Sequence, residues 1–219
     1  LYCCSFSADT VVYKGLVIPS EFDSFYSDLS DTSHRTASVM FHIRFSTNTS
    51  PKWHLAQPYR VIAHNGEINT ISGNRNWALA RMNNLSSKRF GNMRKYQPLV
   101  NQSGSDSSSL DNMIEVLKEG GVNIGRAARM LIPPSWQNTD LMDSDEKAFH
   151  EYNSMHMEAW DGPALICFQD KNFLSCFLDR NGLRPAKIEF FNDETVCISY
   201  EVGSNNDNLK TIKTDRLGP

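Results

Sequence analysis

The chain has 219 residues, of which 40% are hydrophobic and 21% are charged, as is usual for globular proteins. This length is sufficient for a single domain with a substantial core. The net charge of -3 excludes a strong positive field of the kind that attracts nucleic acid or anionic lipid. No apolar run approaches the roughly 18 residues that a membrane-spanning helix needs. We therefore expect a globular protein that binds neither nucleic acid nor a membrane.

Strand-like runs dominate the first third of the chain. β-branched and aromatic residues predict strands over 2–6, 10–18, 36–45 and 59–64. Apolar residues spaced three and four apart predict a short helix over 22–29. The dipeptide Asn65-Gly66 then gives the strongest turn signal in the sequence.

Helical patterns fill the middle of the chain, and strands return at its end. Helices are predicted over 70–82, 110–117, 123–132 and 144–157. The second of these has Asp106 or Ser107 as its expected cap. Four apolar runs predict the final strands: ALICFQ, FLSCFL, AKIEFF and TVCISY. This is an α+β pattern with largely antiparallel sheets, and we expect one domain over 1–219.

Cysteine and histidine spacings do not indicate a metal site. The five cysteines include no C-x-x-C pair and lie in or beside apolar runs, so we expect reduced core thiols in a reducing compartment. The six histidines show no paired ligand spacing. Because no P-loop or G-x-G-x-x-G is present, a phosphate-binding nucleotide site is not expected either.

Arg44 ends a strand-like run and is followed by hydroxyl side chains. A guanidinium offers a bidentate fork to a carboxylate, and a hydroxyl can add a third hydrogen bond. The alternative is a structural arginine paired with a neighbouring aspartate. Spacing alone leaves both interpretations open.

Asn65 and Gly66 suggest an oxyanion hole. An asparagine amide beside an unhindered glycine N–H has the geometry that such a hole requires. The alternative is an ordinary tight turn, which favours the same two residues.

Asp106 lies in the polar run SGSDSSS, just before a helix. Its carboxylate could hold an ammonium group, or it could simply cap the helix. An arginine, an aspartate and an oxyanion hole would together bind an α-amino acid with a reacting carbonyl. A nucleophile is missing from this set.

Longer motifs resemble a known family. The run HIRFSTNT to AHNGEINT closely resembles the class II glutamine amidotransferase domain of the glutamate synthase family, and SGSDSSSLDNM, IPPSWQN, HMEAWDGPA, LDRNGLRPA and SYEVG continue the resemblance in order. It implies an N-terminal-nucleophile hydrolase with a four-layer αββα sandwich. Residues 1–219 would be the central and C-terminal portion of that domain, and the sandwich would be incomplete in them.

The resemblance also implies roles for matching residues. Arg44 and Thr47 would bind the α-carboxylate of glutamine, and Asp106 would bind its α-ammonium group. The Asn65 side-chain amide and the Gly66 N–H would form the oxyanion hole for glutamine hydrolysis.

The motif LDRNGLRPA is expected to form a turn between two strands. Asp179, Arg180 and Arg184 would be held in polar contacts that shape the floor of the site. The alternative is a hairpin with solvated charges.

The sequence departs from the family at its start. The family's nucleophile is an N-terminal cysteine whose own α-amine serves as the base, whereas this chain begins with Leu1. We therefore expect a fragment that lacks the nucleophile and is inactive alone, with Cys3 and Cys4 in the core. The alternatives are a truncated, non-catalytic glutamine-binding paralogue and a hydrolase of another amide.

In the family, ammonia passes to a separate FMN domain that makes glutamate from 2-oxoglutarate. The resemblance implies no cofactor in this domain, but FMN, an iron–sulfur cluster and NAD(P)H or ferredoxin for the rest of the protein. The implied partners are glutamine, the FMN synthase domain of the same polypeptide, and a small electron-transfer subunit or ferredoxin. Without a readable secretion signal, we expect the cytoplasm or a plastid-like organelle.

Overall fold

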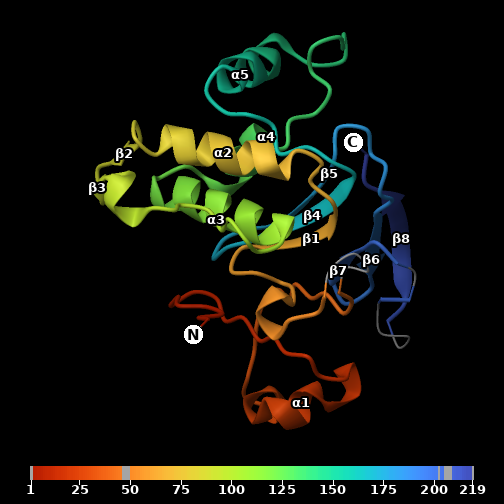
Figure 1. Ribbon diagram of the computed structural model, residues 1–219. Coiled ribbons are helices and arrows are strands. Elements are labelled where there is room, and N and C mark those ends of the chain that lie inside the picture. Colours follow the sequence, from red (N-terminus) through yellow and green to blue (C-terminus); the bar gives the residue numbers. More distant parts are fainter. Residues whose placement is uncertain (1, 46–49, 202, 205–208, 219) are drawn as a thin grey trace.

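The computed structural model describes residues 2–45, 50–201, 203–204 and 209–218. Within them the chain forms two three-stranded antiparallel sheets, one two-stranded sheet and several helices. Figure 1 shows helices gathered over one sheet, the second sheet at the side and the N-terminal segment below. The predicted α+β class with antiparallel sheets is confirmed.

The first sheet has β1 (Ile62–Gly66) at one edge, β4 (Ala164–Gln169) in the middle and β5 (Leu174–Leu178) beyond it. Successive side chains of a strand point to opposite faces. Ile166 lies in the main core on one face, whereas Leu165 belongs to a smaller apolar cluster on the other. Because both faces of β4 are covered, its sequence is almost continuously apolar.

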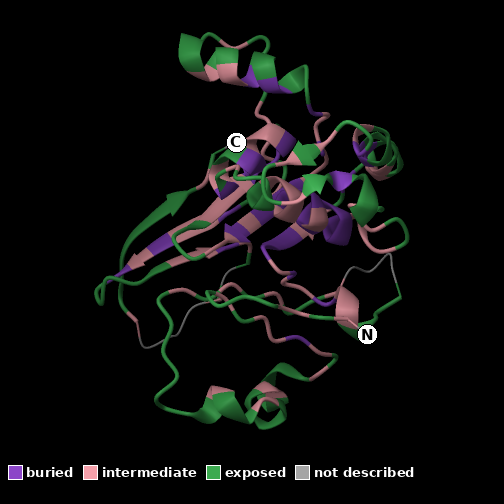
Figure 2. Cartoon of the chain, turned by 90° about the vertical axis from the view of Figure 1, so that its left-hand side faces the viewer, coloured by how far each residue is buried: buried purple, intermediate pink, exposed green. Residues whose placement is uncertain are grey.

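Three helices pack on the face of this sheet that carries Ile166. They are α2 (Ile71–Arg81), α3 (Asp106–Glu119) and α4 (Ile124–Leu131). Leu110 of α3 is completely buried in the shared core. Figure 2 shows that buried residues concentrate between these helices and the sheet. Each large aliphatic side chain buried there contributes about 1.5–3 kcal/mol, so this interface is the main source of stability.

The second sheet has β6 (Lys187–Phe191) between β7 (Val196–Ser199) and β8 (Thr211–Arg216). Ala186, just before β6, packs with Leu165 of the first sheet in the smaller cluster. Every residue of β8 is exposed. In the described part of the chain the layers are therefore helices and two sheets, without a second helical layer over β8.

The remaining elements lie around this framework. They are η1 (Pro19–Glu21), α1 (Phe22–Phe25), η2 (Ser27–Ser30), η3 (Trp53–Leu55), β2 (Ser86–Ser87), β3 (Gly91–Asn92), η4 (Met93–Tyr96) and α5 (Ser144–Ser154). Figure 1 places α5 and α1 at opposite ends of the molecule. Among the described residues, none of the helices is both long and apolar enough to cross a membrane.

The helices predicted over 70–82, 110–117, 123–132 and 144–157 and the four late strands are confirmed, with shifts at their ends. The helix predicted over 22–29 is instead a four-residue helix, α1, followed by the 3-10 turn η2. The helix predicted over 110–117 begins earlier, at Asp106. Its cap is Ser105, whose side-chain oxygen accepts a hydrogen bond of 3.1 Å from the N–H of Ser108. The expectation of Asp106 or Ser107 as the cap was therefore wrong. Strand β8 was not predicted, because its exposed, polar sequence lacks an apolar face.

The strands predicted over 2–6, 10–18 and 36–45 are wrong. These segments run as irregular chain, and apolar side chains such as Phe6 and Phe41 are exposed by 98% and 56%. A strand needs a neighbour with which to exchange backbone hydrogen bonds. Within the described ranges, none of the strands pairs with these segments.

Lys14 fastens the N-terminal segment to the rest of the molecule. Its buried ammonium donates a hydrogen bond of 2.9 Å to the carbonyl of Ala56. The same Nζ lies 5.0 Å and 4.7 Å from the ring centroids of Tyr2 and Tyr59. Burial lowers the pKa of Lys14 to about 8, because the charged form loses hydration. The two rings and the carbonyl offset part of that loss.

Asp111 joins α3 to the edge of β1. Its buried carboxylate accepts hydrogen bonds from the N–H groups of Val61 at 2.9 Å, Ile62 at 3.2 Å and Arg60 at 3.4 Å. Burial, aided by the nearby Glu115 charge, raises the pKa of Asp111 to about 7. The side chain therefore replaces a neighbouring strand at this edge.

Replacing Asp111 with Ala should destabilise the intact protein by about 1–3 kcal/mol, because buried N–H groups lose their acceptor. Asp111→Asn has the same shape and keeps one oxygen acceptor, so it should cost less. Denaturant unfolding followed by circular dichroism measures both values. Equal losses in the two variants would show that packing, and not the acceptor, accounts for the effect.

Candidate active site

Asn65 and Gly66 form the end of strand β1, so the expectation of a tight turn was wrong. Asn65 lies opposite Leu165 and Gly66 lies opposite Ala164 in the antiparallel ladder with β4. Residues that pair across strands share a face. The Asn65 side chain therefore points to the side of the second sheet, where Leu165 packs.

The Gly66 N–H points away from β4. Val61 accepts a ladder bond of 2.9 Å from Gln169, and the Glu67 N–H donates one of 3.1 Å to Pro163. Antiparallel ladder bonds alternate along a strand, so odd-numbered residues of β1 bond to β4 and even-numbered ones face the opposite edge. The Gly66 N–H consequently points to that free edge.

The other even-numbered N–H groups on this edge bind side chains. Ile62 donates to Asp111, and His64 donates to Gln57 at 2.6 Å. The Gln57 amide also donates back to the carbonyl of His64 at 2.8 Å. Among the described residues, no acceptor is found for the N–H of Gly66. This donor is free for a ligand.

Both Gly66 and Gly162 are positions where backbones approach closely. A Cβ on Gly66 would clash with the carbonyl oxygen of Pro163, and a Cβ on Gly162 would clash with that of Glu67. A side chain at either position would push the end of β1 away from β4. Glycine is therefore required at both by the space available.

Asp106 is the first residue of α3, and its carboxylate reaches out of the helix to the chain that follows β1. One oxygen accepts a hydrogen bond of 2.9 Å from the N–H of Ile68, and the other accepts one of 2.7 Å from the N–H of Ser107. The simple-cap interpretation was wrong, because Ser105 caps this helix. Asp106 is thus held next to the segment that carries Asn65 and Gly66.

His64 connects β1 to the first turn of α3. It is buried, and its Nδ1 lies 2.7 Å from the hydroxyl oxygen of Ser107. Burial lowers the pKa of His64 to about 4, although the charge of Asp106 opposes this shift. The imidazole is therefore neutral near pH 7.

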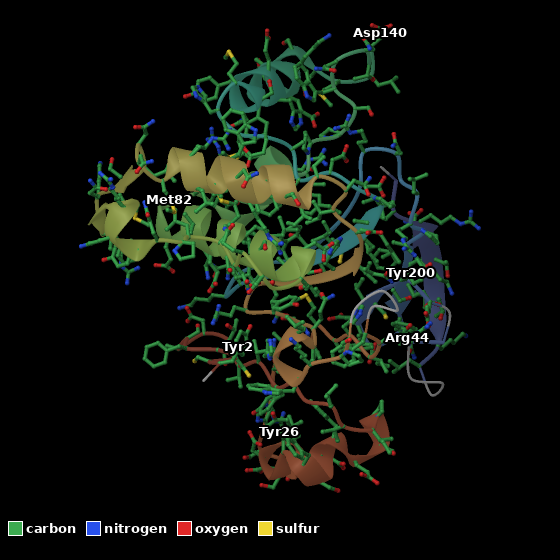
Figure 3. The ribbon with its side chains drawn as sticks, in the orientation of Figure 1. Tyr2, Tyr26, Arg44, Met82, Asp140 and Tyr200 are labelled. Atoms are coloured by element: carbon green, nitrogen blue, oxygen red, sulfur yellow. The ribbon has the colours of Figure 1, made fainter. Side chains whose placement is uncertain are left out.

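Of the two residues expected to bind the α-carboxylate of glutamine, only Arg44 lies within the described residues. The Arg44 side chain is 74% exposed, and its guanidinium lies 4.0 Å from the carboxylate of Glu201. Figure 3 shows it beside the second sheet, near Tyr200. Thr47 lies outside the described residues. Within the described residues, no ion pair or hydrogen bond links Arg44 to Asp106.

The motif LDRNGLRPA makes the polar contacts expected of it. Buried Asp179 accepts a hydrogen bond of 2.9 Å from the N–H of Ala164, the residue opposite Gly66. Arg180 forms an ion pair of 2.8 Å with Asp161, and the guanidinium of Arg184 donates to the hydroxyl of Tyr200 at 3.2 Å. A hairpin with fully solvated charges is therefore excluded.

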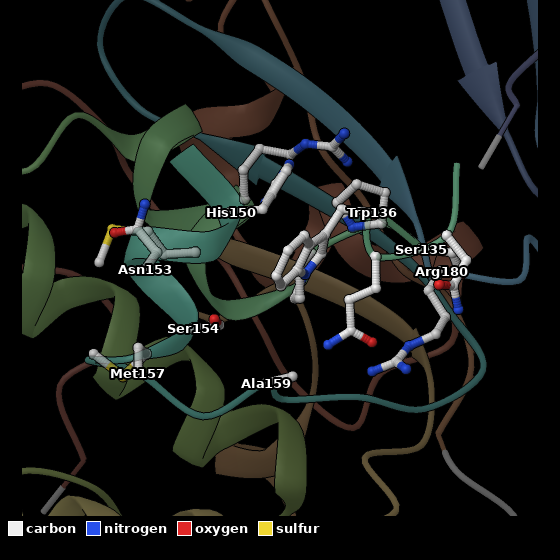
Figure 4. Close-up of a pocket in the computed structure, with 14 residues that line it drawn as sticks. Ser135, Trp136, His150, Asn153, Ser154, Met157, Ala159 and Arg180 are labelled. Atoms are coloured by element: carbon white, nitrogen blue, oxygen red, sulfur yellow. The ribbon is translucent and has the colours of Figure 1, made fainter. Parts of the chain in front are cut away.

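A pocket of about 390 Å³ lies elsewhere, between α4, α5 and the segment IPPSWQN. Figure 4 shows Trp136, His150 and Arg180 among its lining residues. The rings of Trp136 and His150 are stacked with centroids 6.5 Å apart. Asn65 and Asp106 do not line this pocket, whereas Arg180 of the motif LDRNGLRPA does.

Sequence reasoning missed the residues that brace β1. Gln57 and Asp111 act through side-chain hydrogen bonds to backbone groups, and no spacing pattern identifies such contacts.

Within the described ranges, His, Cys, Asp and Glu side chains form no cluster of three suited to a metal ion. The site thus offers backbone and amide donors and a carboxylate, a set that can polarise a carbonyl and hold an ammonium group.

A sheet edge with a free glycine N–H, an asparagine amide and a neighbouring carboxylate suits an amide-hydrolysing enzyme. Residues 1–219 match the family of class-II glutamine amidotransferases, and the chain belongs to this family. The resemblance predicted from the motifs is confirmed.

Several glutamate synthases are similar to this chain. The NADPH glutamate synthase large chain of Bacillus subtilis is 46% identical over 92% of this chain and 13% of its own length. The NADH glutamate synthase of Schizosaccharomyces pombe is 42% identical over 93% of this chain and 10% of its own. The chloroplastic ferredoxin-dependent glutamate synthase of Oryza sativa is 40% identical over 100% of this chain and 14% of its own. The chain therefore spans a small part of these relatives.

Replacing His64 with Gln should remove a pH dependence of stability. The pKa of His64 is about 4 in the folded state and 6.5 when unperturbed, so between these values the unfolded state binds more protons. Stability from this group is complete above pH 6.5 and is lost as pH falls toward 4, by on the order of 3 kcal/mol.

The measurement is the free energy of unfolding of wild type minus that of His64→Gln, between pH 7 and pH 4. This difference should become smaller as the pH falls. His34→Gln is the matched control, since His34 is exposed and its replacement should give a flat difference. A flat difference for His64→Gln would contradict a neutral, buried imidazole.

Proposed function

We propose that this chain is part of a domain that hydrolyses glutamine to glutamate and ammonia within a glutamate synthase. The observation that carries the proposal is the Gly66 N–H, which faces the free edge of β1 beside Asn65. The similarity to glutamate synthases over most or all of the chain supports it. A non-catalytic paralogue is not favoured, because these relatives are named as synthases.

In the proposed reaction a thiolate attacks the side-chain carbonyl carbon of glutamine. The Asn65 amide and the Gly66 N–H stabilise the oxyanion that forms. The tetrahedral intermediate collapses with loss of ammonia, and water then hydrolyses the thioester to glutamate. Arg44 and Thr47 bind the α-carboxylate, and Asp106 binds the α-ammonium group.

The attacking thiolate in this proposal is the family's N-terminal cysteine, activated by its own α-amine. None of the five cysteines of residues 1–219 is assigned this role. Cys3 is exposed and Cys4 is partly exposed, so the expectation that both lie in the core was wrong. The Cys3 thiol donates to the carbonyl of Ser5 at 3.2 Å. Cys167, Cys176 and Cys197 lie in strands of the two sheets. We therefore propose that residues 1–219 alone release no ammonia from glutamine.

The remaining family features complete the proposal. The two sheets would form the centre of a four-layer αββα sandwich, and Asp179, Arg180 and Arg184 would support the floor of the site. Ammonia would pass to an FMN domain of the same polypeptide. That domain would use an iron–sulfur cluster and electrons from NAD(P)H or ferredoxin.

Replacing Asn65 with Ala in the intact enzyme should lower the kcat for glutamine hydrolysis about 10²–10³-fold, because one oxyanion donor is lost. The KM for glutamine should change little, since the interaction develops mainly in the transition state. Asn76→Ala, at an exposed position of α2, is the control and should leave both constants unchanged. An Asn65→Ala enzyme with wild-type kcat would remove Asn65 from the mechanism.

Replacing Arg44 with Lys should raise the KM for glutamine, because the charge remains but the bidentate fork is lost. Arg44→Ala should have a larger effect, of about 2–5 kcal/mol in substrate binding. Glutamate formation from added ammonia should persist in both variants. The exposed Arg35 serves as the control in an Arg35→Lys enzyme. Unchanged KM values in the Arg44 variants would contradict a role for Arg44 in glutamine binding and would leave only its interaction with Glu201.

A further inference from the structure

Two cysteines face each other across the first sheet. Cys167 in β4 and Cys176 in β5 are direct partners in the antiparallel ladder. Their sulfur atoms are 2.8 Å apart. Both side chains are partly exposed, and both are free thiols. This pair is independent of the residues assigned to glutamine hydrolysis.

The backbone places the pair at a position that permits a disulfide. The N–H of Asp179 bonds to Ala164 at 3.0 Å, and the N–H of Asp170 bonds to Phe173 at 2.9 Å. These bonds mark the hydrogen-bonded positions, so Cys167 and Cys176 fall at a non-hydrogen-bonded position between them. Opposite Cα atoms at such positions lie about 4.5 Å apart. Disulfides span Cα separations of about 4.4–6.8 Å, so no backbone movement is required.

The two thiols share one environment. Both sulfurs lie on the face of the smaller cluster, beside Leu165 and Tyr200, rather than in the main core. They are within hydrogen-bonding distance of each other, and either one can be the donor. The thiolate is the reactive form of cysteine. A hydrogen bond from one thiol favours the thiolate of the other, so either sulfur can attack first.

We propose that Cys167 and Cys176 form an oxidation site for hydrogen peroxide that closes to a disulfide between β4 and β5. The thiolate of one cysteine attacks one peroxide oxygen, the O–O bond breaks, and the released hydroxide takes a proton to leave as water. That cysteine is then a sulfenic acid. The sulfur of the other cysteine attacks the sulfenic acid sulfur, the S–O bond breaks and a second water leaves. The two thiols lose two electrons in total, and the peroxide is reduced to two waters.

The disulfide would join the middle strand of the sheet to β5. The same strand, β4, pairs on its other side with β1, which carries Asn65 and Gly66. Oxidation would thus link β5 covalently to β4, the strand that pairs with β1, without changing any residue of the candidate active site. Cys197 provides a contrast, because its ladder partner is Glu189.

Tryptic peptide mapping of the intact enzyme tests the proposal directly. Cleavage after Lys147, Lys171 and Arg180 places Cys167 in peptide 148–171 and Cys176 in peptide 172–180. After brief treatment with hydrogen peroxide and alkylation of the remaining thiols, mass spectrometry should find these peptides linked, two hydrogens lighter than their sum. Dithiothreitol should separate them. The Cys197→Ser enzyme should give the same linked pair.

Serine variants test the pairing of the two sulfurs. In Cys176→Ser, peroxide should leave a sulfenic acid at Cys167 that dimedone traps, because the second sulfur is missing. In Cys167→Ser, dimedone should trap Cys176 in the same way. Recovery of both peptides as separate alkylated thiols from peroxide-treated wild type, with circular dichroism showing a folded protein, would overturn the proposal.

Discussion

One edge of β1 is satisfied by side chains instead of a neighbouring strand, and the candidate site depends on this arrangement. Asp111 accepts from the start of the strand, Gln57 bonds to both backbone groups of His64, and Asp106 accepts from Ile68. Unpaired buried N–H groups are costly, so each of these contacts is needed for the strand to keep its position. The N–H of Gly66 is left between them as a donor in a fixed place.

Helix α3 links this edge to the core. Its first turn supplies Asp106 and Ser107, and Asp111 follows on the next turn. Polar contacts to β1 and to the residues on either side of it therefore come from one rigid element. The same side of the helix contributes Leu110 and other apolar residues to the main core. The packing of α3 in the core therefore also determines the position of β1.

The sequence predicted the α+β class, the main helices and the late strands, because those elements bury a periodic apolar face. It also indicated Asn65, Gly66 and Asp106 as candidate site residues. The alternative interpretations of these residues as a tight turn and a helix cap could be rejected only once the structure was known. The strands predicted over 2–6, 10–18 and 36–45 failed because strand propensity does not specify a partner. Gln57 was missed because its role depends on a backbone group seven residues away.

The close approach at Gly66 and Gly162 has a consequence for how this region tolerates change. At most sites in a protein, a small shift of packed side chains moves the functional group with them. Here the separation of the two segments is set by backbone atoms in contact, with no side chain between them to yield or shrink. Substitutions in the surrounding core would therefore reduce the stability of the fold before they displace the Gly66 N–H. The stability of the fold and the position of this donor can thus vary independently.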